Sequence, residues 1–215
     1  LASLAESAFD PLARTCKFML TEEAHHLFVG ESGVARIIQR TCEVMNQLKT
    51  DDPVKLRAAG VIDLPTLQKY LNFHFSVTSD LYGAEISSNA ATYYTTGLKG
   101  RFEETKIADD HKLDDSQYEV MDVAGDKILS HHVPALTALN ERLRDDWVKD
   151  VQAGIDRWNR VPEKLGINFR FALPHKGFHR KIGMFADVHV APDGRLLSEA
   201  EWTHLHQNWL PSEED

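Results

Sequence analysis

The sequence predicts an all-α helical bundle with a small mixed appendage at its C-terminal end. Apolar residues recur at steps of three and four through most of the chain, which is the periodicity of helices that bury one face. Alternating, strand-like segments occur only after residue 160. A length of 215 residues suffices for one large domain, or for a domain with a small addition. We therefore assign residues 1–160 to the bundle and residues 161–215 to the appendage.

The longest periodic segment begins after Asp10 and Pro11, a good N-cap residue followed by a residue suited to the first helical turn. Residues 1–9 read as the last turns of a preceding helix. The pattern predicts either one helix from Pro11 to about Lys49 or two nearly coaxial helices that meet at Gly30–Gly33. An unbroken helix would be about 58 Å long, which suits a bundle. The expected inward face comprises Leu12, Cys16, Met19, Leu27, Gly30, Val34, Ile38, Thr41, Met45 and Leu48.

The remaining elements follow from breaks in the pattern at proline, glycine and charged residues. We expect helices at about 54–59, 66–98, 118–131 and 134–160, with a charged connection at 101–117. The charged run at 141–146 is expected to lie on solvated helix surface. In the appendage we expect a strand at 168–173, a hairpin at 188–197 around Pro192-Asp193-Gly194, and a short helix opened by the capping box Ser198–Glu201.

Composition and charge narrow the classes of function. The 24 basic and 33 acidic residues give a net charge of −9, which argues against nucleic acid as a partner. No apolar run is long enough to span a membrane, and no secretory signal is visible, so we expect a cytoplasmic protein. Cys16 and Cys42 lack metal-site spacing and are expected to be reduced core residues. Because the chain begins at Leu1 without Met, within a helical pattern, we expect it to be part of a longer polypeptide.

The segment 21–26 contains two overlapping Glu-x-x-His pairs, Glu22 with His25 and Glu23 with His26. Residues three apart on a helix lie on one face, with Cβ atoms about 5–6 Å apart. A carboxylate and an imidazole placed in this way can share one first-row metal ion such as iron, manganese or zinc.

The apolar pattern favours Glu23 and His26 as the metal ligands, because their face of the helix is the expected inward one. A carboxylate buried there would be costly unless it coordinates a metal. Glu22 and His25 then flank the site. Only Glu201 with His204 repeats the spacing elsewhere, on the short tail helix, and His204–His206 would diverge on a helix. The chain therefore supplies half of a two-metal site of the kind that helical bundles build.

Four segments carry a resemblance to the oxygenase subunit of benzoyl-CoA epoxidase, a family of ferritin-like di-iron enzymes, and the resemblance extends over essentially all 215 residues. They are SLAESAFDPLARTCKFMLTEEAHHLFVGESG, GVIDLPTLQKYLNFHFSVTSDLYGAEISSNAATYYTTGLKGRFEE, NERLRDDWVKDVQAGIDRWNR and LPHKGFHRKIGMFADVHV. The family's chains are longer, and this chain resembles their C-terminal half.

The resemblance implies a ferritin-like fold and two iron ions that use O2 to convert benzoyl-CoA into its 2,3-epoxide. It further implies electrons from NADPH, delivered by a separate reductase that carries FAD and iron–sulfur clusters, and a possible homodimer. Glu23 and His26 match the family's second Glu-x-x-His pair. The family's other ligands would precede Leu1.

Three alternatives remain open at this point. The chain could belong to a related ring epoxidase that acts on phenylacetyl-CoA, or to a non-catalytic helical interaction subunit that kept the motif. It could also belong to a zinc hydrolase, which would need a third ligand that the sequence does not identify. If the family reading failed, Asp80 or Glu85 could serve as a metal ligand.

Two groups of residues are candidates for substrate binding. Lys176 and Arg180 lie in the densest basic cluster and could meet the phosphates of coenzyme A, unless that loop is merely solvated or contacts another subunit. Asn89 and Tyr94 could line a pocket for the thioester, unless they make contacts between helices.

Overall fold

The computed structural model describes residues 1–100 and 116–213, and the chain folds into two compact units that are interleaved along the sequence. Most of the predicted connection at 101–117 lies outside the described residues. Unit 1 comprises Leu1–Leu27, Ser79–Trp147 and Lys181–Asp187, and unit 2 comprises Phe28–Thr78, Val148–Arg180 and Val188–Asp215. The predicted division at residue 160 stays a prediction. No helix among the described residues is long and apolar enough to cross a membrane.

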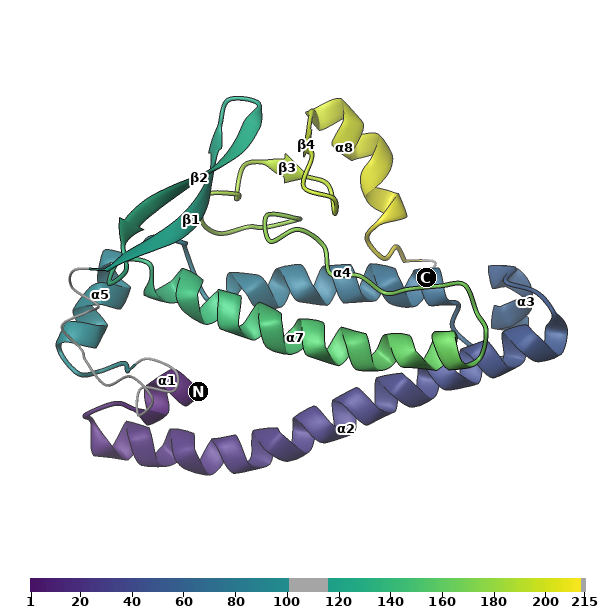
Figure 1. The fold of residues 1–215 in the computed structure, drawn as a ribbon, viewed down its shortest axis with the longest axis horizontal. Coiled ribbons are helices and arrows are strands. Elements are labelled where there is room, and N and C mark those ends of the chain that lie inside the picture. The colour runs from purple at the N-terminus through teal and green to yellow at the C-terminus, as the bar shows by residue number, and fades with distance from the viewer. Residues whose placement is uncertain (101–115, 214–215) are drawn as a thin grey trace. The chain divides into compact units, whose positions relative to one another are not determined.

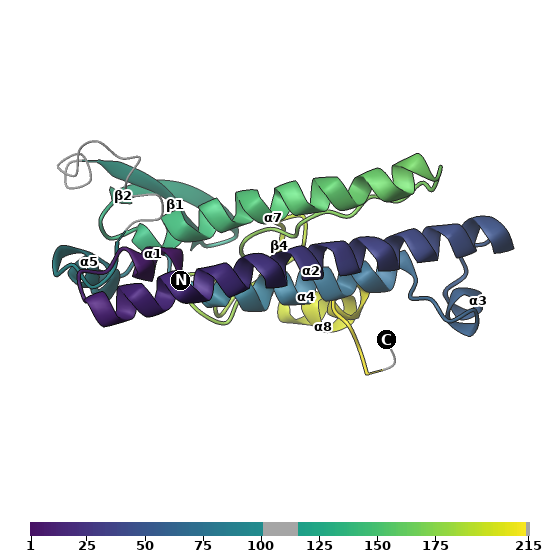
Figure 2. The same ribbon diagram turned by 90° about the horizontal axis from the view of Figure 1, so that it is seen from below.

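Helix α2 (Asp10–Leu48) is one unbroken helix of 39 residues, which resolves the alternative that the sequence left open (Figure 2). Gly30 and Gly33 lie inside it, and apart from the adjacent helix backbone nothing lies within 4 Å of where a side chain would start. A glycine costs about 1 kcal/mol in a helix interior, which is too little to break a helix of this length. The helix ends where Lys49 adopts a left-handed φ of 52° and the Thr50 N–H donates to the Met45 carbonyl at 3.2 Å.

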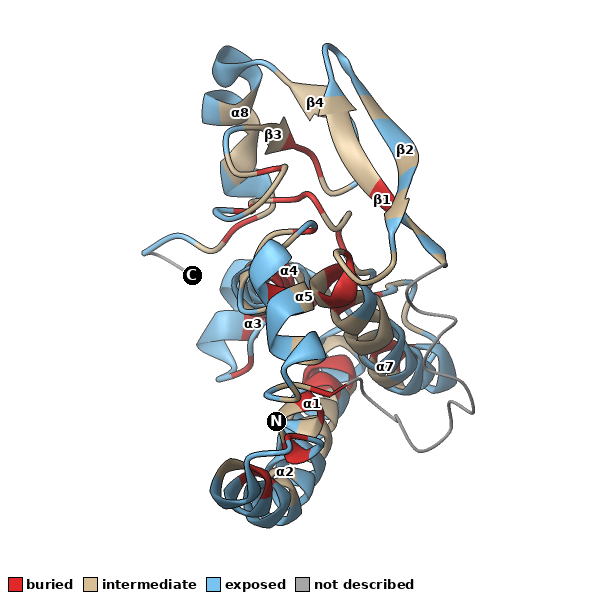
Figure 3. Ribbon diagram, turned by 90° about the vertical axis from the view of Figure 1, so that its left-hand side faces the viewer, coloured by how far each residue is buried: buried red, intermediate tan, exposed pale blue. Residues whose placement is uncertain are grey.

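Unit 1 contains a β-hairpin where the sequence was expected to be helical. Strands β1 (Gln117–Ala124) and β2 (Lys127–Pro134) pair antiparallel, so the predicted helix at 118–131 is wrong (Figure 1). Gly125, with φ at 64°, supplies the left-handed residue that the tight turn requires. Val120 is buried, whereas most of the hairpin is exposed or half-buried (Figure 3).

The side chain of Tyr118 fixes the hairpin to helix α7 (Leu139–Lys164). Its hydroxyl donates to Asp145 Oδ2 at 2.8 Å. Burial, together with this hydrogen bond to a carboxylate, raises the pKa of Tyr118 above its usual value. Helix α7 begins five residues after the predicted start, because Pro134 closes β2 instead. Unit 1 also contains the short helix α1 (Ala2–Ala5) and the first part of α2.

The long helical stretch predicted at 66–98 is divided in the structure. Helix α4 (Leu64–Asp80) ends before a loop, and α5 (Ser88–Thr95) begins after it. Gly83 takes a left-handed φ of 83° within the loop. Ser87 then caps α5, since its hydroxyl accepts a hydrogen bond from the Ala90 N–H at 3.1 Å. Apolar spacing continues through this loop, so periodicity alone did not reveal the break.

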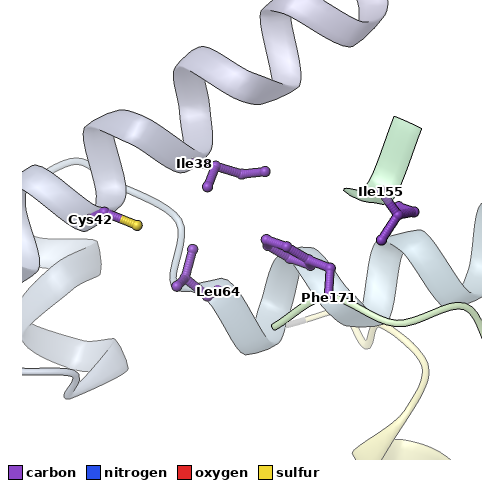
Figure 4. Close-up of a cluster of buried hydrophobic side chains, with 5 residues drawn as sticks. All are labelled: Ile38, Cys42, Leu64, Ile155 and Phe171. Carbon is purple, nitrogen blue, oxygen red and sulfur yellow. The ribbon is translucent and has the colours of Figure 1, made fainter. Parts of the chain in front are cut away.

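The core of unit 2 forms where α2, α4 and α7 meet an extended segment. Ile38 and Cys42 come from α2, Leu64 from α4 and Ile155 from α7, and Phe171 completes the cluster (Figure 4). Both cysteines of the chain are buried and free, as predicted. Helix α3 (Pro53–Ala58) confirms the short helix expected there and is capped by Asp52.

The strand predicted at 168–173 is wrong: the segment is irregular, and within residues 1–100 and 116–213 it belongs to no sheet. The side chain of Asn159 takes the place of a partner strand: its Oδ1 accepts from the Phe171 N–H at 2.7 Å, and its Nδ2 donates to the Phe171 carbonyl at 2.9 Å. An alternating pattern therefore arose from packing against helices rather than from a sheet.

The C-terminal part of unit 2 matches the prediction closely. Strands β3 (His189–Val190) and β4 (Leu196–Leu197) form the expected hairpin, with Gly194 at φ 90° in its turn. Helix α8 (Glu199–Leu205) opens with the complete capping box, and the 3₁₀ helix η2 (His206–Asn208) follows. The indole of Trp202 on α8 stacks on the ring of His189, with centroids 4.9 Å apart.

Candidate metal centre

Glu23 and His26 lie one helical turn apart on α2, within unit 1. Glu23 Oε1 and His26 Nδ1 are 3.6 Å apart, and the two side chains are 45% and 63% exposed. Bonds from oxygen or nitrogen to a first-row metal are about 2.0–2.2 Å, so two such bonds span at most about 4.4 Å. The pair can therefore share one metal ion, and its carboxylate and imidazole are ligands that iron accepts.

The second overlapping pair points elsewhere. Glu22 and His25 are both exposed, whereas Glu23 is half-buried. The rings of His25 and His26 have centroids 6.3 Å apart and are tilted by 56°. Because consecutive residues leave an α-helix about 100° apart, the two pairs project from different sides of α2, and only one pair can face a given metal site.

The described residues do not complete a ligand set. No group of three or more His, Cys, Asp or Glu side chains converges on one point within them. Glu201, which shares the motif spacing with His204, is occupied by the capping box, where hydrogen bonds from Ser198 hold the pKa of its carboxyl below the usual value. The remaining ligands of a site at Glu23 and His26 would have to come from elsewhere.

The apolar surface around the pair is uncovered by the described part of the chain. Phe18 and Leu27 are 71% and 72% exposed, and Met19 is 42% exposed. The expected inward face is thus buried at Cys16, farther toward the start of α2, but open beside the candidate ligands. Met19 and Leu27 lie four residues before and after Glu23 and so flank the pair, whereas Phe18 lies on the face of Glu22 and His25. Large exposed apolar side chains beside the pair are typical of a surface that another segment covers.

The four candidate substrate residues lie in different surroundings. Asn89 is exposed and Tyr94 half-buried on α5 in unit 1. In unit 2, Lys176 is half-buried, and Arg180 is buried with its guanidinium donating to the Lys176 carbonyl at 3.3 Å. Their role in substrate binding stays a prediction.

Unit 1 holds a buried ionic cluster that the sequence analysis placed on solvated surface. Arg144 is fully buried, and its guanidinium contacts Glu141, one turn before it on α7, and Glu85, from the loop after α4, at 3.4 Å. Both carboxylates are also buried. The expectation of a solvated surface is therefore wrong at Glu141 and Arg144. The sequence does contain an indication of this burial. Arg144 precedes the buried Ile155 by 11 residues, close to three helical turns, so the two side chains lie on the same face of α7.

The carboxylates considered as alternative ligands already bind protein groups. Glu85 Oε2 accepts a hydrogen bond from the Met184 N–H at 2.8 Å, while its other oxygen faces Arg144. Asp80 Oδ2 accepts from the Lys181 N–H at 2.9 Å. Both side chains thus anchor the segment 181–187 within unit 1, which explains their position without a metal.

A Glu-x-x-His pair on a long helix of a mainly helical chain is typical of the proteins that hold two metal ions between their helices. No protein-family model matches the chain. Over all 215 residues the chain is 86% identical to benzoyl-CoA oxygenase component B from Aromatoleum evansii. It spans 46% of the length of that protein. The similarity confirms the resemblance identified from the sequence.

Proposed function

We propose that this chain is part of an oxygenase component that epoxidises the aromatic ring of benzoyl-CoA with O2 at a di-iron centre. The Glu23–His26 pair is the observation on which the proposal rests, because its two donor atoms lie 3.6 Å apart on one helix face. The 86% identity to benzoyl-CoA oxygenase component B supports the choice of substrate.

In this proposal the chain supplies one of the ligand pairs, and the others come from polypeptide outside residues 1–215. The relative is more than twice as long as this chain, which leaves room for such a segment. A ferritin-like di-iron site takes two Glu-x-x-His pairs and two further carboxylates from four helices. Helices that bring those ligands to Glu23 and His26 would also cover the exposed side chains of Met19 and Leu27, which flank Glu23 on the same side of α2.

In the proposed reaction the metal ions and the protein side chains have different roles. When bound, the two irons supply the reduction of O2. One oxygen atom of O2 would enter the ring as the 2,3-epoxide. The other would take up two protons and two electrons and leave as water, the electrons coming from NADPH through a separate reductase that carries FAD and iron–sulfur clusters. Glu23 and His26 hold metal, and the covered apolar side chains of α2 keep water away from it.

The iron content of the full-length protein tests the ligand assignment. We expect about two irons per chain, as in other proteins of this class. Glu23→Gln and His26→Gln should each reduce the iron content sharply. Glu22→Gln and His25→Gln are matched controls, since they make the same changes one residue earlier and should leave iron in place. Loss of iron in the control variants alone would reassign the site, and a wild-type protein that binds no iron would refute the oxygenase.

Product analysis tests the substrate. The full-length protein, supplied with NADPH and its reductase, should convert benzoyl-CoA to the 2,3-epoxide and leave phenylacetyl-CoA largely unchanged. Preference for phenylacetyl-CoA would move the proposal to the related ring epoxidase. Absence of product from both thioesters, with iron bound, would favour a non-catalytic subunit.

A further inference from the structure

Unit 2 contains a groove, of about 270 Å³, in which basic side chains border an apolar floor. One wall is helix α2, and the other is the connection that follows α3. The lining residues are Arg36, Ile37, Arg40 and Thr41 from α2, and Gly60, Val61 and Ile62 from the connection.

Hydrogen bonds and apolar packing within unit 2 hold the two walls of the groove together. The Thr41 hydroxyl donates to the Ile62 carbonyl at 2.7 Å, which fixes the connection against α2. The Val61 N–H donates to the Leu56 carbonyl at 3.1 Å, and Val61 packs into the small apolar cluster beneath. Gly60 adopts a left-handed φ of 78°, and no atom lies within 4 Å of where its side chain would start. This end of the groove is therefore open.

Positive charge in the groove is poorly compensated. Arg36 and Arg40 are one helical turn apart, and no carboxylate lines the groove. Arg40 reaches Glu43 only at 3.9 Å, and Glu43 also accepts from Gln39 at 2.9 Å. Within the described part of the chain, Arg36 forms no ion pair. Two guanidinium groups exposed side by side in a protein of net charge −9 mark a local site for an anion.

The apolar side chains in the groove indicate that its ligand carries an organic group as well as a negative charge. Ile37 and Ile62 are 41% and 44% exposed beside the two arginines. Guanidinium groups bind phosphate oxygens through paired hydrogen bonds, and exposed isoleucines offer an apolar surface to an attached organic group. The volume is below the range of about 300–1,000 Å³ that encloses a whole drug-sized ligand. The groove therefore suits one end of a larger phosphorylated molecule.

We propose that this groove binds the phosphorylated nucleotide end of the coenzyme A thioester, with Arg36 and Arg40 on its phosphates and Ile37 and Ile62 against its organic part. The inference rests on the proposed function for the identity of the ligand. It moves the phosphate contact from the loop at 175–181, where Arg180 is buried, to side chains that are exposed on α2.

Calorimetric titration of the full-length protein tests the proposal with three probes. Benzoyl-CoA carries the nucleotide phosphates, benzoyl-pantetheine thioester lacks them, and NADPH carries nucleotide phosphates from a different source. Arg36→Gln and Arg40→Gln are the test variants. Arg14→Gln is the matched control, because it removes the same charge from an exposed position on the same helix. Iron content and the thermal midpoint are measured on each sample.

Each test variant should raise the Kd for benzoyl-CoA at least about tenfold, which corresponds to about 1.4 kcal/mol. The Kd for benzoyl-pantetheine should stay unchanged, and Arg14→Gln should change neither. Equal effects on both thioesters, an effect no larger than that of Arg14→Gln, or undetectable binding of benzoyl-CoA by wild type would overturn the inference. So would a loss confined to NADPH. Because binding is measured apart from iron, a protein without iron would refute only the di-iron proposal.

Discussion

Replacement of Arg144 by methionine should destabilise the protein strongly, although the position lies in a highly charged stretch of sequence. The Arg144 side chain is fully buried and faces the carboxylates of Glu85 and Glu141. Its guanidinium also donates to the carbonyls of Ser79 and Gly83. Methionine keeps much of the volume but removes the guanidinium that both carboxylates face.

The magnitude follows from the contacts that are lost. A hydrogen bond to a charged group contributes about 1.5–3 kcal/mol, and Arg144 makes such bonds to two buried carboxylates. Removal of one partner from a buried ion pair costs about 3–5 kcal/mol, because the remaining charge stays away from water. We therefore expect Arg144→Met to lower the free energy of unfolding by about 3–5 kcal/mol.

Urea denaturation of the full-length protein, followed by circular dichroism, measures this loss. Arg142→Met is the matched control. Arg142 is two residues away on the same helix, is 52% exposed, and pairs with Asp146 at 3.3 Å. An exposed pair contributes about 0–1 kcal/mol, so the control should stay within about 1 kcal/mol of wild type.

Equal losses in Arg144→Met and Arg142→Met would show that burial of the ionic cluster has been misjudged. A triple variant that also changes Glu85 and Glu141 to glutamine gives a second check. It also removes the two negative charges that face Arg144 and should recover part of the stability that Arg144→Met loses. A triple variant less stable than the single one would refute the reasoning from charge.

Three further predictions concern the packing and titration of the fold. Gly183→Ala should cost more than about 2 kcal/mol, because a Cβ would lie 2.0 Å from Glu85 Oε2 on a backbone with φ at 86°. Burial, and then the positive charge of Lys176, hold the pKa of His175 below its ordinary value of 6.5. The stability that the neutral imidazole contributes is therefore present above pH 6.5. It is lost as the pH falls toward the lower pKa of the folded state. Thermal unfolding should therefore show a smaller loss between pH 8 and pH 5.5 in His175→Gln than in wild type. Ile155→Ala, at 1% exposure in the core, should cost about 2–5 kcal/mol, whereas Val54→Ala, at 76% exposure, should stay within about 0.5 kcal/mol.

Each of these results has a clear contrary outcome. A Gly183→Ala protein with the same thermal midpoint as wild type would show that Glu85 lies farther from residue 183 in solution. If the thermal stability of wild type and of His175→Gln fell in parallel with pH, His175 would not contribute to the loss of stability in acid. A larger effect at Val54 than at Ile155 would contradict the position of the core.

Elements marked by local signals were predictable from the sequence. Helix α2 followed from its long period and its start at Asp10, and α8 from its capping box. The turn at Gly194 followed from the residues around it. In each case neighbouring residues alone determine the local backbone, so no knowledge of distant contacts was needed.

Elements decided by distant contacts were not predictable in this way. The hairpin at 117–134 depends on pairing and on the anchor from Tyr118 to α7, and its helical reading ignored the turn at Gly125. Arg144 reads as a surface residue until Glu85, 59 positions away, is placed beside it. The candidate metal centre was predictable only in part: Glu23 and His26 share a face of α2, but the described residues bring no third ligand to them.

The three charges at positions 85, 141 and 144 also constrain how this chain can diverge. Loss of Arg144 alone leaves two buried carboxylates that no longer face its guanidinium, whereas loss of one carboxylate still leaves Arg144 beside the other. Natural variants should therefore seldom replace Arg144 by an uncharged residue while both glutamates remain. Substitutions at position 85 or 141 alone should be more frequent among homologues than substitutions at position 144 alone.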